Sequence, residues 1–414
     1  MMRSLFAGVS GLKNHQTRMD VIGNNIANVN TVGFKTSRVN FQDVLSQTLQ
    51  GASSAQGNKG GTNPMQVGLG VGLASIDTIF TDGSFQPTGK LTDLSIQGQG
   101  FFVLKDASGN NIYTRAGNFD FDKQGNFLVP GTGFKVMGYK ATSGVVGTQL
   151  GDLKVPVGSA MAPKPTSKAT FTKNLDASAE IGKSMSKTVT VYDTNGGAHN
   201  VSCNFTKSGI DTWSMAVAAG DATSTVTGGP YTVTFNPDGS ITTANAAGAA
   251  APVGFVVTPA APGSPGAAVT VAPDFSGLTQ FAGDATLVGD SDGYKSGTMQ
   301  NVSIDPNGSI MGRFDNGQSQ VLGKVALALF ENPGGLTKVG SNMFVESSNS
   351  GVAAIDQGGV GGRGSFSPGT LEMSNVDLAN EFSSMIITQR GFQANSKIIT
   401  VTDEMLQDLA NLKR

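Results

Sequence analysis

The stretch SLFAGVSGLKNHQTRMDVIGNNIAN, residues 4–28, carries an apolar residue at every seventh position. These residues, with two apolar neighbours, are Leu5, Val9, Leu12, Met19, Ile22 and Ile26. At this spacing they fall on one stripe of an α-helix, and a seven-residue repeat keeps such a stripe facing a second, supercoiled helix. The stretch therefore predicts an amphipathic helix that ends near the Asn-rich residues 23–30.

The C-terminal part of the chain has the same repeat. Its apolar positions are Leu378, Phe382, Met385, Phe392, Ile399 and Leu406. Few other segments are typical of a long helix, so we expect the two terminal helices to pack on each other. The alternative is a pair of ordinary surface helices, each docked on a globular core.

The composition favours an extended β protein with many turns. Of 414 residues, 57 are glycine and only 14% are charged, with a formal net charge of −2. No basic face or Lys/Arg run points to nucleic acid. One cysteine, Cys203, rules out a disulfide within the chain. We also expect neither a secretory signal at the N-terminus nor a transmembrane helix.

The order of patterns predicts a nested, mainly β fold with paired terminal α-helices. We assign residues 1–30 and 372–414 to the helices, 31–70 to an extended connecting segment, 71–147 and 290–371 to a first β domain, and 148–289 to a second β domain inserted into it. Within these, 39–49 reads as a short helical or irregular piece, 51–63 as a flexible connection and the Ala/Pro/Gly-rich 244–273 as a surface loop.

A search for chemical sites finds none, so we expect no catalytic, cofactor-binding or metal-binding residues, and not an enzyme. Gly98-Gln99-Gly100 lacks the third glycine and the following helix of a dinucleotide motif and is typical of a turn. Two histidines, His15 and His199, stand far apart in sequence and build no catalytic set. Cys203 lies in an alternating run and is most simply a buried apolar residue.

Several long motifs resemble those of the flagellar rod and hook axial proteins. The first is MDVIGNNIANVNTVGFK, residues 19–35. Others are residues 96–102, 113–119, 364–371, 374–379 and 389–397. The motif residues that we single out are Asn24, Asn25, Ala27, Asn28, Thr31, Gly33 and Phe34. These motifs cover both predicted helices and the first β domain, whereas residues 148–289 carry none.

The inserted β domain and the length of the chain resemble the hook members of this family. The resemblance implies a structural subunit that assembles into a curved, hollow helical homopolymer, transmitting torque from rod to filament as a universal joint. It also implies an extracellular position in the flagellum at the cell surface, and partners comprising the distal rod protein, the hook cap, the hook–filament junction protein and the flagellar type III export apparatus. Nucleic acid and small-molecule substrates are not among the expected partners.

The resemblance adds two expectations about mechanism. The C-terminal helix would line the central channel with the N-terminal helix outside it, both folding on polymerisation, and residues 31–70 would bridge neighbouring subunits. Some hook proteins are linked covalently through a cysteine and a lysine, which makes Cys203 a candidate for a crosslink, with a core position as the alternative. Two other classes stay open: a distal rod protein, and a secreted β-rich adhesin or hydrolase.

Overall fold

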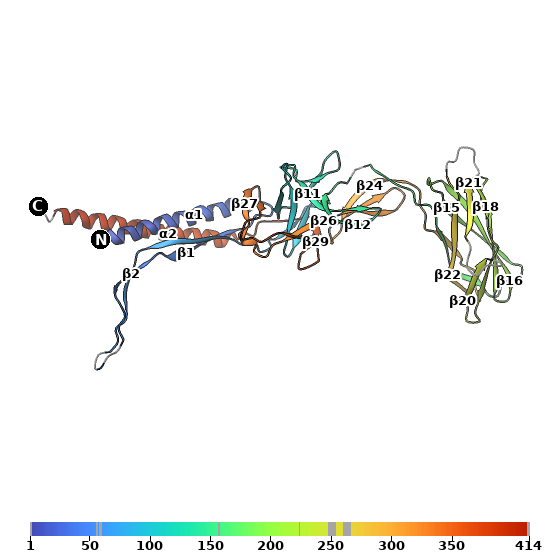
Figure 1. The fold of residues 1–414 in the computed structure, drawn as a ribbon, viewed down its shortest axis with the longest axis horizontal. Coiled ribbons are helices and arrows are strands. Elements are labelled where there is room, and N and C mark those ends of the chain that lie inside the picture. The colour runs from blue at the N-terminus through green and yellow to red at the C-terminus, as the bar shows by residue number, and fades with distance from the viewer. Residues whose placement is uncertain are drawn as a thin grey trace. The chain divides into compact units, whose positions relative to one another are not determined.

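The computed structural model describes residues 2–54, 57, 60–155, 158–222, 224–246, 254–259 and 266–411. The chain divides into two compact units, the first formed by residues 1–156, 302–311 and 320–414 and the second by 157–301 and 312–319. The prediction of a mainly β chain with two paired terminal helices is confirmed (Figure 1). Among the described residues, no helix is both long and apolar enough to span a membrane.

The first unit contains both helices, α1 (Met2–Ala27) and α2 (Leu378–Asn411), which pair in antiparallel orientation (Figure 1). Asn25 near the end of α1 bonds Glu381 in the first turn of α2, while Gly8 lies against Ile399. Asp377 caps α2, because its Oδ1 accepts hydrogen bonds from the backbone N–H groups of residues 379 and 380. Both chain ends therefore lie at the same end of the helix pair.

The connecting segment forms a two-stranded ribbon in place of the expected short helical or irregular piece. β1 (Ser37–Asp43) pairs with β4 (Val71–Thr78), and beyond them β2 (Ser46–Gln50) pairs with β3 (Met65–Gly68). The reason for the correction is that the segment's backbone partners are supplied by a strand about thirty residues away, which local spacing does not reveal. The flexible connection expected over 51–63 lies partly outside the described residues.

The β part of the first unit is built mainly on one sheet, whose pairings β11-β7, β7-β8, β8-β28 and β28-β27 are antiparallel. Its main path runs β26-β11-β7-β8-β28-β27, and the core between the strands includes Phe101, Tyr113, Met137 and Phe344. The bounds are β7 (Phe101–Lys105), β8 (Asn111–Thr114), β9 (Asp120–Phe121), β10 (Phe127–Leu128), β11 (Lys135–Thr142), β12 (Val145–Asp152), β26 (Ser319–Leu329), β27 (Thr337–Gly340), β28 (Met343–Val345) and β29 (Ala354–Gln357). A short 3₁₀ helix spans Pro333–Gly335.

Two short strand pairs bring the segment before α2 onto the beginning of this β region. β5 (Phe85–Pro87) pairs with β31 (Thr370–Glu372), and β6 (Leu94–Gln97) pairs with β30 (Ser365–Pro368). The pairings place Glu372 beside the loop that follows β4. Segments that are nearly 300 residues apart in sequence are thus fixed next to each other where the helices join the β region.

The second unit is built on two five-stranded sheets with a shared apolar core. One sheet has the order β18-β21-β22-β14-β23 and the other β15-β16-β17-β19-β20. The bounds are β14 (Lys168–Asp176), β15 (Ser184–Tyr192), β16 (Ala198–Gly209), β17 (Thr212–Ala219), β18 (Ser224–Thr227), β19 (Tyr231–Phe235), β20 (Ile241–Ala246), β21 (Phe255–Pro259), β22 (Val269–Phe281) and β23 (Val288–Ser291). β21 and the start of β22 replace part of the surface loop expected over 244–273.

The remaining strands lie near the boundaries between the units. They are β13 (Ala160–Met161), β24 (Gly297–Ile304) and β25 (Ser309–Phe314), and the last two have residues in both units. The second unit begins later than the predicted insertion at 148, because β12 pairs with β11 and so belongs to the first unit. It also extends past residue 289, because β23 pairs with β14.

Candidate functional site

The motif after α1 builds the junction between the helices and the β region. Asn25 is buried, and its amide is fully used: Nδ2 donates to the Ser37 carbonyl at 2.8 Å and to Glu381 Oε1 at 3.0 Å, while Oδ1 accepts from the Ser37 N–H at 3.0 Å. Only a side chain with both a donor and an acceptor satisfies these three groups. Asn25 therefore joins α1, β1 and α2 at one point.

The neighbouring motif residues end α1. Asn28 Nδ2 donates to the carbonyl of Asn24 at 2.9 Å, and Thr31 Oγ1 donates to Asn28 Oδ1 at 3.1 Å. Ala27 is the last helical residue and is exposed. The Asn24 carbonyl also accepts from the Asn28 backbone N–H, so Asn28 and Thr31 hold the turn that follows the last helical residue.

Gly33 can only be glycine in this structure. Its φ of 67° lies in the left-handed region, and a Cβ would fall 2.6 Å from the Ala116 backbone nitrogen. Its N–H donates to the Glu372 carbonyl at 2.8 Å. The next residue, Phe34, is buried, with the Lys338 ammonium 5.2 Å from its ring centroid.

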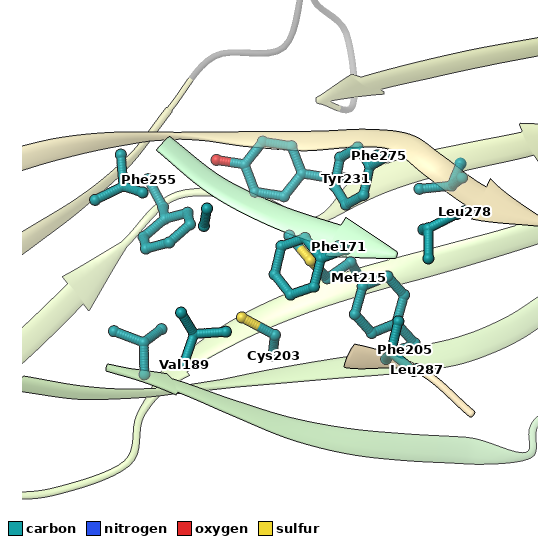
Figure 2. Close-up of a cluster of buried hydrophobic side chains, with 14 of the residues drawn as sticks. Phe171, Val189, Cys203, Phe205, Met215, Tyr231, Phe255, Phe275, Leu278 and Leu287 are labelled. Atoms are coloured by element: carbon teal, nitrogen blue, oxygen red, sulfur yellow. The ribbon is translucent and has the colours of Figure 1, made fainter. Parts of the chain in front are cut away.

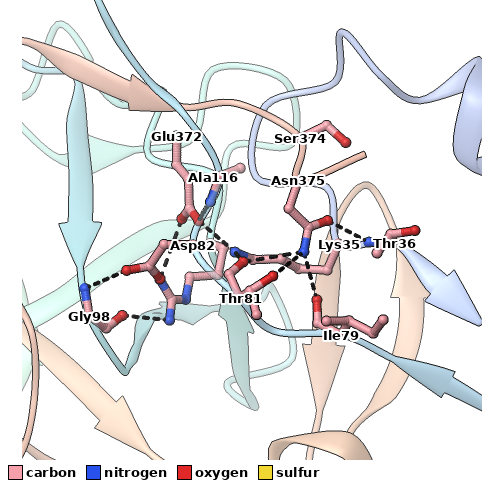
Figure 3. A network of polar contacts seen from close by, with 12 residues as sticks. Lys35, Thr36, Ile79, Thr81, Asp82, Gly98, Ala116, Glu372, Ser374 and Asn375 are labelled. Carbon is pink, nitrogen blue, oxygen red and sulfur yellow. Dashed lines mark hydrogen bonds and ion pairs between the residues drawn. The ribbon is translucent and has the colours of Figure 1, made fainter. Parts of the chain in front are cut away.

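Two cations and two carboxylates meet at the junction (Figure 3). Lys35 Nζ lies 2.5 Å from Glu372 Oε1, and Arg115 Nη1 lies 3.4 Å from both Glu372 Oε2 and Asp82 Oδ1. Lys35, Arg115 and Glu372 are buried. Burial lowers the pKa of Lys35, and the Glu372 carboxylate opposes that shift.

Backbone groups complete this ionic cluster, as Figure 3 shows. The Thr81 carbonyl accepts from Lys35 Nζ at 2.7 Å, and the Gly98 carbonyl accepts from Arg115 Nη2 at 2.8 Å. Asn375, from the motif before α2, accepts from the Thr36 N–H at 2.8 Å and donates to the Thr81 carbonyl. Four of the sequence motifs thus converge on one buried site. The motifs contain Lys35 and Arg115, but their pairing with Glu372 is not predictable from the sequence, because nothing local connects them.

The predicted apolar stripes are only partly covered within one chain. On α1, Ile22 is buried, Val9 is exposed, and Leu5, Leu12, Met19 and Ile26 are partly buried. On α2, Met385 and Ile399 are partly buried, and the exposed apolar residues are 38–64% accessible. That exposed set is Leu378, Phe382, Ile386, Ile387, Phe392, Ile398, Val401, Met405, Leu406 and Leu409.

Small and polar residues take part in the contact between the helices. Gly8 and Gly11 of α1 lie against Asn395, and Gly391 of α2 lies against His15. On α2 the contacting face repeats every seven residues through Glu381, Thr388, Asn395 and Thr402, and both threonines are buried. Ile22 is buried and Met385 and Ile399 are partly buried, so the packing of the apolar stripes on each other stays a prediction. Glycines let the two backbones approach closely at this contact, while ten large apolar side chains of α2 stay exposed.

The other single residues that the sequence highlighted lie in the second unit or in the helix contact. Cys203 is fully buried in the core of the second unit (Figure 2), and burial raises the pKa of its thiol to about 12. His199 is buried 3.2 Å from Asp193. Among the described residues, no group of three or more His, Cys, Asp or Glu side chains is arranged to hold a metal ion.

Comparison with known proteins gives this arrangement a context. Four flagellar family models match in order along the chain: the flagella basal body rod protein model at residues 5–35, the hook protein FlgE/F/G D1 domain at 95–172, the basal body protein FlaE D2 domain at 160–294, and the basal body rod FlgEFG C-terminal model at 367–412. They cover both helices and segments of both β regions. Such a combination defines an axial protein of the bacterial flagellum.

Full-length relatives narrow the class. The chain is 43% identical to the flagellar hook protein FlgE of Borreliella burgdorferi and 42% identical to that of Treponema pallidum, with complete coverage of both chains in each case. It is 34% identical to the basal-body rod protein FlgG of Bacillus subtilis, also with complete coverage. The chain belongs to the flagellar hook protein family, and its place is the flagellum, outside the cell.

A solved structure supports the fold alone. The Helicobacter pylori hook protein FlgE2 superposes with a TM-score of 0.52 at 14% identity, covering 68% of this chain and 98% of that one. These relatives are all rod or hook proteins. The adhesin and hydrolase alternatives are therefore set aside.

Proposed function

We propose that this chain is the structural subunit of the flagellar hook and that it assembles into a curved hollow tube that transmits torque from rod to filament. The observation that carries the proposal is the exposed apolar face of α2. A helix that keeps ten large apolar side chains substantially exposed, while its contact with α1 is small and polar, is suited to burial against further copies. Sequence kinship with hook proteins supports the same conclusion.

The energetics favour folding of the helices on assembly. Burying one large apolar side chain contributes about 1.5–3 kcal/mol, whereas ordering each residue costs about 1–2 kcal/mol. Within one chain, α1 covers little of the apolar face of α2, so the balance for the isolated pair lies near zero. Neighbouring copies would supply the missing burial. Residues 1–30 and 372–414 then form the inner tube, with α2 toward the channel.

The ribbon is proposed to bridge neighbouring subunits. Its apolar side chains are exposed, namely Val44, Leu45, Leu49, Met65, Val67 and Leu69. The strand pairing places Leu45, Met65, Val67 and Leu69 on one face together with Gln47 and Gln50, and Ser46, Thr48 and Gln66 on the other, with a register shift between Thr48 and Gln50. Since an isolated two-stranded ribbon is marginally stable in water, a second copy against its apolar face would stabilise it.

The β regions are proposed as the outer layers, with the β part of the first unit next to the helices and the second unit, residues 157–301 and 312–319, outermost. Contacts between such polar surfaces are wet and can re-form as the tube bends.

From the sequence kinship with hook proteins we also propose the partners of this chain. They are the distal rod protein, the hook cap, the hook–filament junction protein and the type III export apparatus. We propose a structural role with no catalysis. The buried Cys203 supports a core role more than a crosslink between subunits.

The test is assembly in cells that lack their own copy of the gene. Phe392→Ser combined with Leu406→Ser removes two exposed apolar side chains from α2 and should abolish tubes in electron micrographs, with the chain still produced. Val352→Ser is the matched control, because Val352 is 84% exposed in a loop outside the helices. Curved tubes with the control support the hook assignment. Normal tubes with the double variant, or hooks on cells without the gene, contradict it.

A further inference from the structure

The contact between α1 and α2 contains two reciprocal insertions. At Gly11 of α1, an added Cβ would lie 2.8 Å from Asn395 Cγ, Oδ1 and Nδ2. At Gly391 of α2, an added Cβ would lie 2.7 Å from His15 Cε1 and 2.8 Å from His15 Nε2. Each glycine therefore leaves space that a polar side chain of the opposite helix fills.

The four residues form a symmetric pattern. Gly11 and His15 are one helical turn apart on α1, and Gly391 and Asn395 are one turn apart on α2. Because the helices are antiparallel, each helix offers one space and inserts one side chain. We propose that Gly11, His15, Gly391 and Asn395 form a register lock, which fixes the axial position of the two terminal helices relative to each other.

Both inserted side chains are held by further contacts. Asn395 Nδ2 donates to the carbonyl of Gly391 at 3.0 Å, which fixes the amide against its own helix. The His15 ring packs edge-on against Phe41 of β1, with 5.8 Å between ring centroids and an interplanar angle of 75°. A side chain with a fixed position discriminates between registers better than a mobile one.

A one-turn slip is unfavourable in either direction. One slip sets His15 opposite Asn395, where two large polar side chains compete for the space of one. The other sets Gly11 opposite Gly391, which leaves a gap with no packing atoms on either side. Polar residues at a helix contact are known to select register at some cost in stability.

The polar insertions add specificity that apolar burial alone supplies weakly. Most large apolar side chains of α2 stay exposed in this pairing, so burying them does not distinguish one register from another. The register lock is distinct from the assembly face of α2. It determines how the helices pair within a chain, whatever the chain assembles into.

The experiment uses the full chain with cysteines at Gly8 and Ile399, whose side-chain positions lie within 3.5 Å. Oxidation yields are measured on free chains and on tubes, with the unsubstituted chain as the blank for Cys203. Gly391→Val, which fills the space, should lower the yield at least five-fold. Gly23→Val is the matched control, because a Cβ at Gly23 meets nothing within 4 Å.

The decisive variant exchanges the inserted histidine and the facing glycine between the two helices. His15→Gly combined with Gly391→His keeps the number of helical glycines and should restore at least half of the original yield. Equal yields for Gly391→Val and Gly23→Val would overturn the lock, as would an exchange variant no better than Gly391→Val.

Failure of pairing and failure of assembly are distinguishable. No crosslink between Gly8 and Ile399 positions in free chains or in tubes of the parent would overturn the lock itself. Crosslinked free chains that form no tubes would preserve the lock and count against the hook proposal.

Discussion

The side-chain amide of Asn25 lies 3.0 Å from the carboxylate of Glu381, so the end of α1 is bonded directly to the first turn of α2. Asn25 also bonds both backbone groups of Ser37, which ties β1 to the same point. The negative charge of Glu381 is favourable in the first turn of α2 because the N-terminal end of a helix carries a partial positive charge. The junction therefore orients both helices and the ribbon together.

Asn25→Asp should destabilise the assembled protein strongly. The new carboxylate would face Glu381 and could no longer donate to the Ser37 carbonyl, which costs about 2–4 kcal/mol. The loss is measured as a lower temperature of thermal disassembly of the tubes. Asn24→Asp is the control, since Asn24 is exposed. Similar temperatures for the two variants would argue against the junction's role.

Glu372→Gln should be more damaging than the loss of an exposed ion pair. Lys35 and Arg115 would stay buried without a carboxylate between them, and breaking a buried pair costs about 3–5 kcal/mol. Lys90→Met, which removes an exposed pair with Asp120, should cost at most about 1 kcal/mol. Urea unfolding followed by circular dichroism measures the free energy of unfolding of both variants. Equal urea midpoints for Glu372→Gln and Lys90→Met would mean that the ionic cluster contributes little to stability.

Acid should weaken the second unit through Asp292. Burial alone would raise its pKa, but hydrogen bonds from Ser167 and the Lys168 N–H, together with the Lys164 ammonium, lower it to about 2. A carboxyl group with a depressed folded-state pKa stabilises above its unfolded pKa, and that stability is lost as the pH falls from about 4 to about 2. Allowing for partial exposure, we expect about 1–2 kcal/mol.

The single tryptophan gives a direct readout of this loss. Trp213 is buried in the core of the second unit, so its fluorescence reports that unit's unfolding. Asp292→Asn should unfold at lower urea concentration at pH 7 and should show a smaller change between pH 4 and pH 2, since Asp193 and Asp274 of this unit also have lowered pKa values. Asp290→Asn, an exposed neighbour, should behave like the parent. If the urea midpoint of the parent chain did not change between pH 4 and pH 2, Asp292 would not stabilise the second unit as proposed.

Cys203 should resist thiol reagents in the folded chain. The thiolate is the reactive form, and a pKa of about 12 with full burial leaves almost none at pH 8. We expect labelling at least about a hundred-fold slower than at Ser186→Cys, which is exposed on β15. Comparable rates would reopen a crosslinking role for Cys203.

The heptad pattern predicts the existence of both terminal helices but not the face on which they pair. Hydrophobic periodicity identifies which side of a helix avoids water, and it does not say which molecule covers that side. In this chain most of the large apolar side chains of α2 are exposed, while Gly391 and Asn395 contact α1. The seven-residue repeat of polar residues at 381, 388, 395 and 402 is the feature of the sequence that could have indicated the pairing face of α2.

Pairing between distant segments explains the other differences between the expected and the observed strands. Val39 and Phe41 alternate as strand residues do, but their partners lie beyond residue 70, so local spacing alone favours a helical or irregular interpretation. The Ala/Pro/Gly-rich region hides β21, whose Phe255 and Val257 are buried. The ionic cluster combines residues from four separate segments, and charge complementarity among them exists only after folding.

The contacts at the junction also impose an order of events on the chain. Lys35 and Glu372 are separated by 337 positions, and Asn25 and Glu381 by 356. Contacts of such sequence separation form late, because the intervening loop must close first. A chain synthesised or delivered from its N-terminus holds α1 without its partner until almost the last residue has emerged. Delivery of the C-terminus is thus the event that completes the inner helix pair, and a truncated chain would lack the surface on which the next subunit could add.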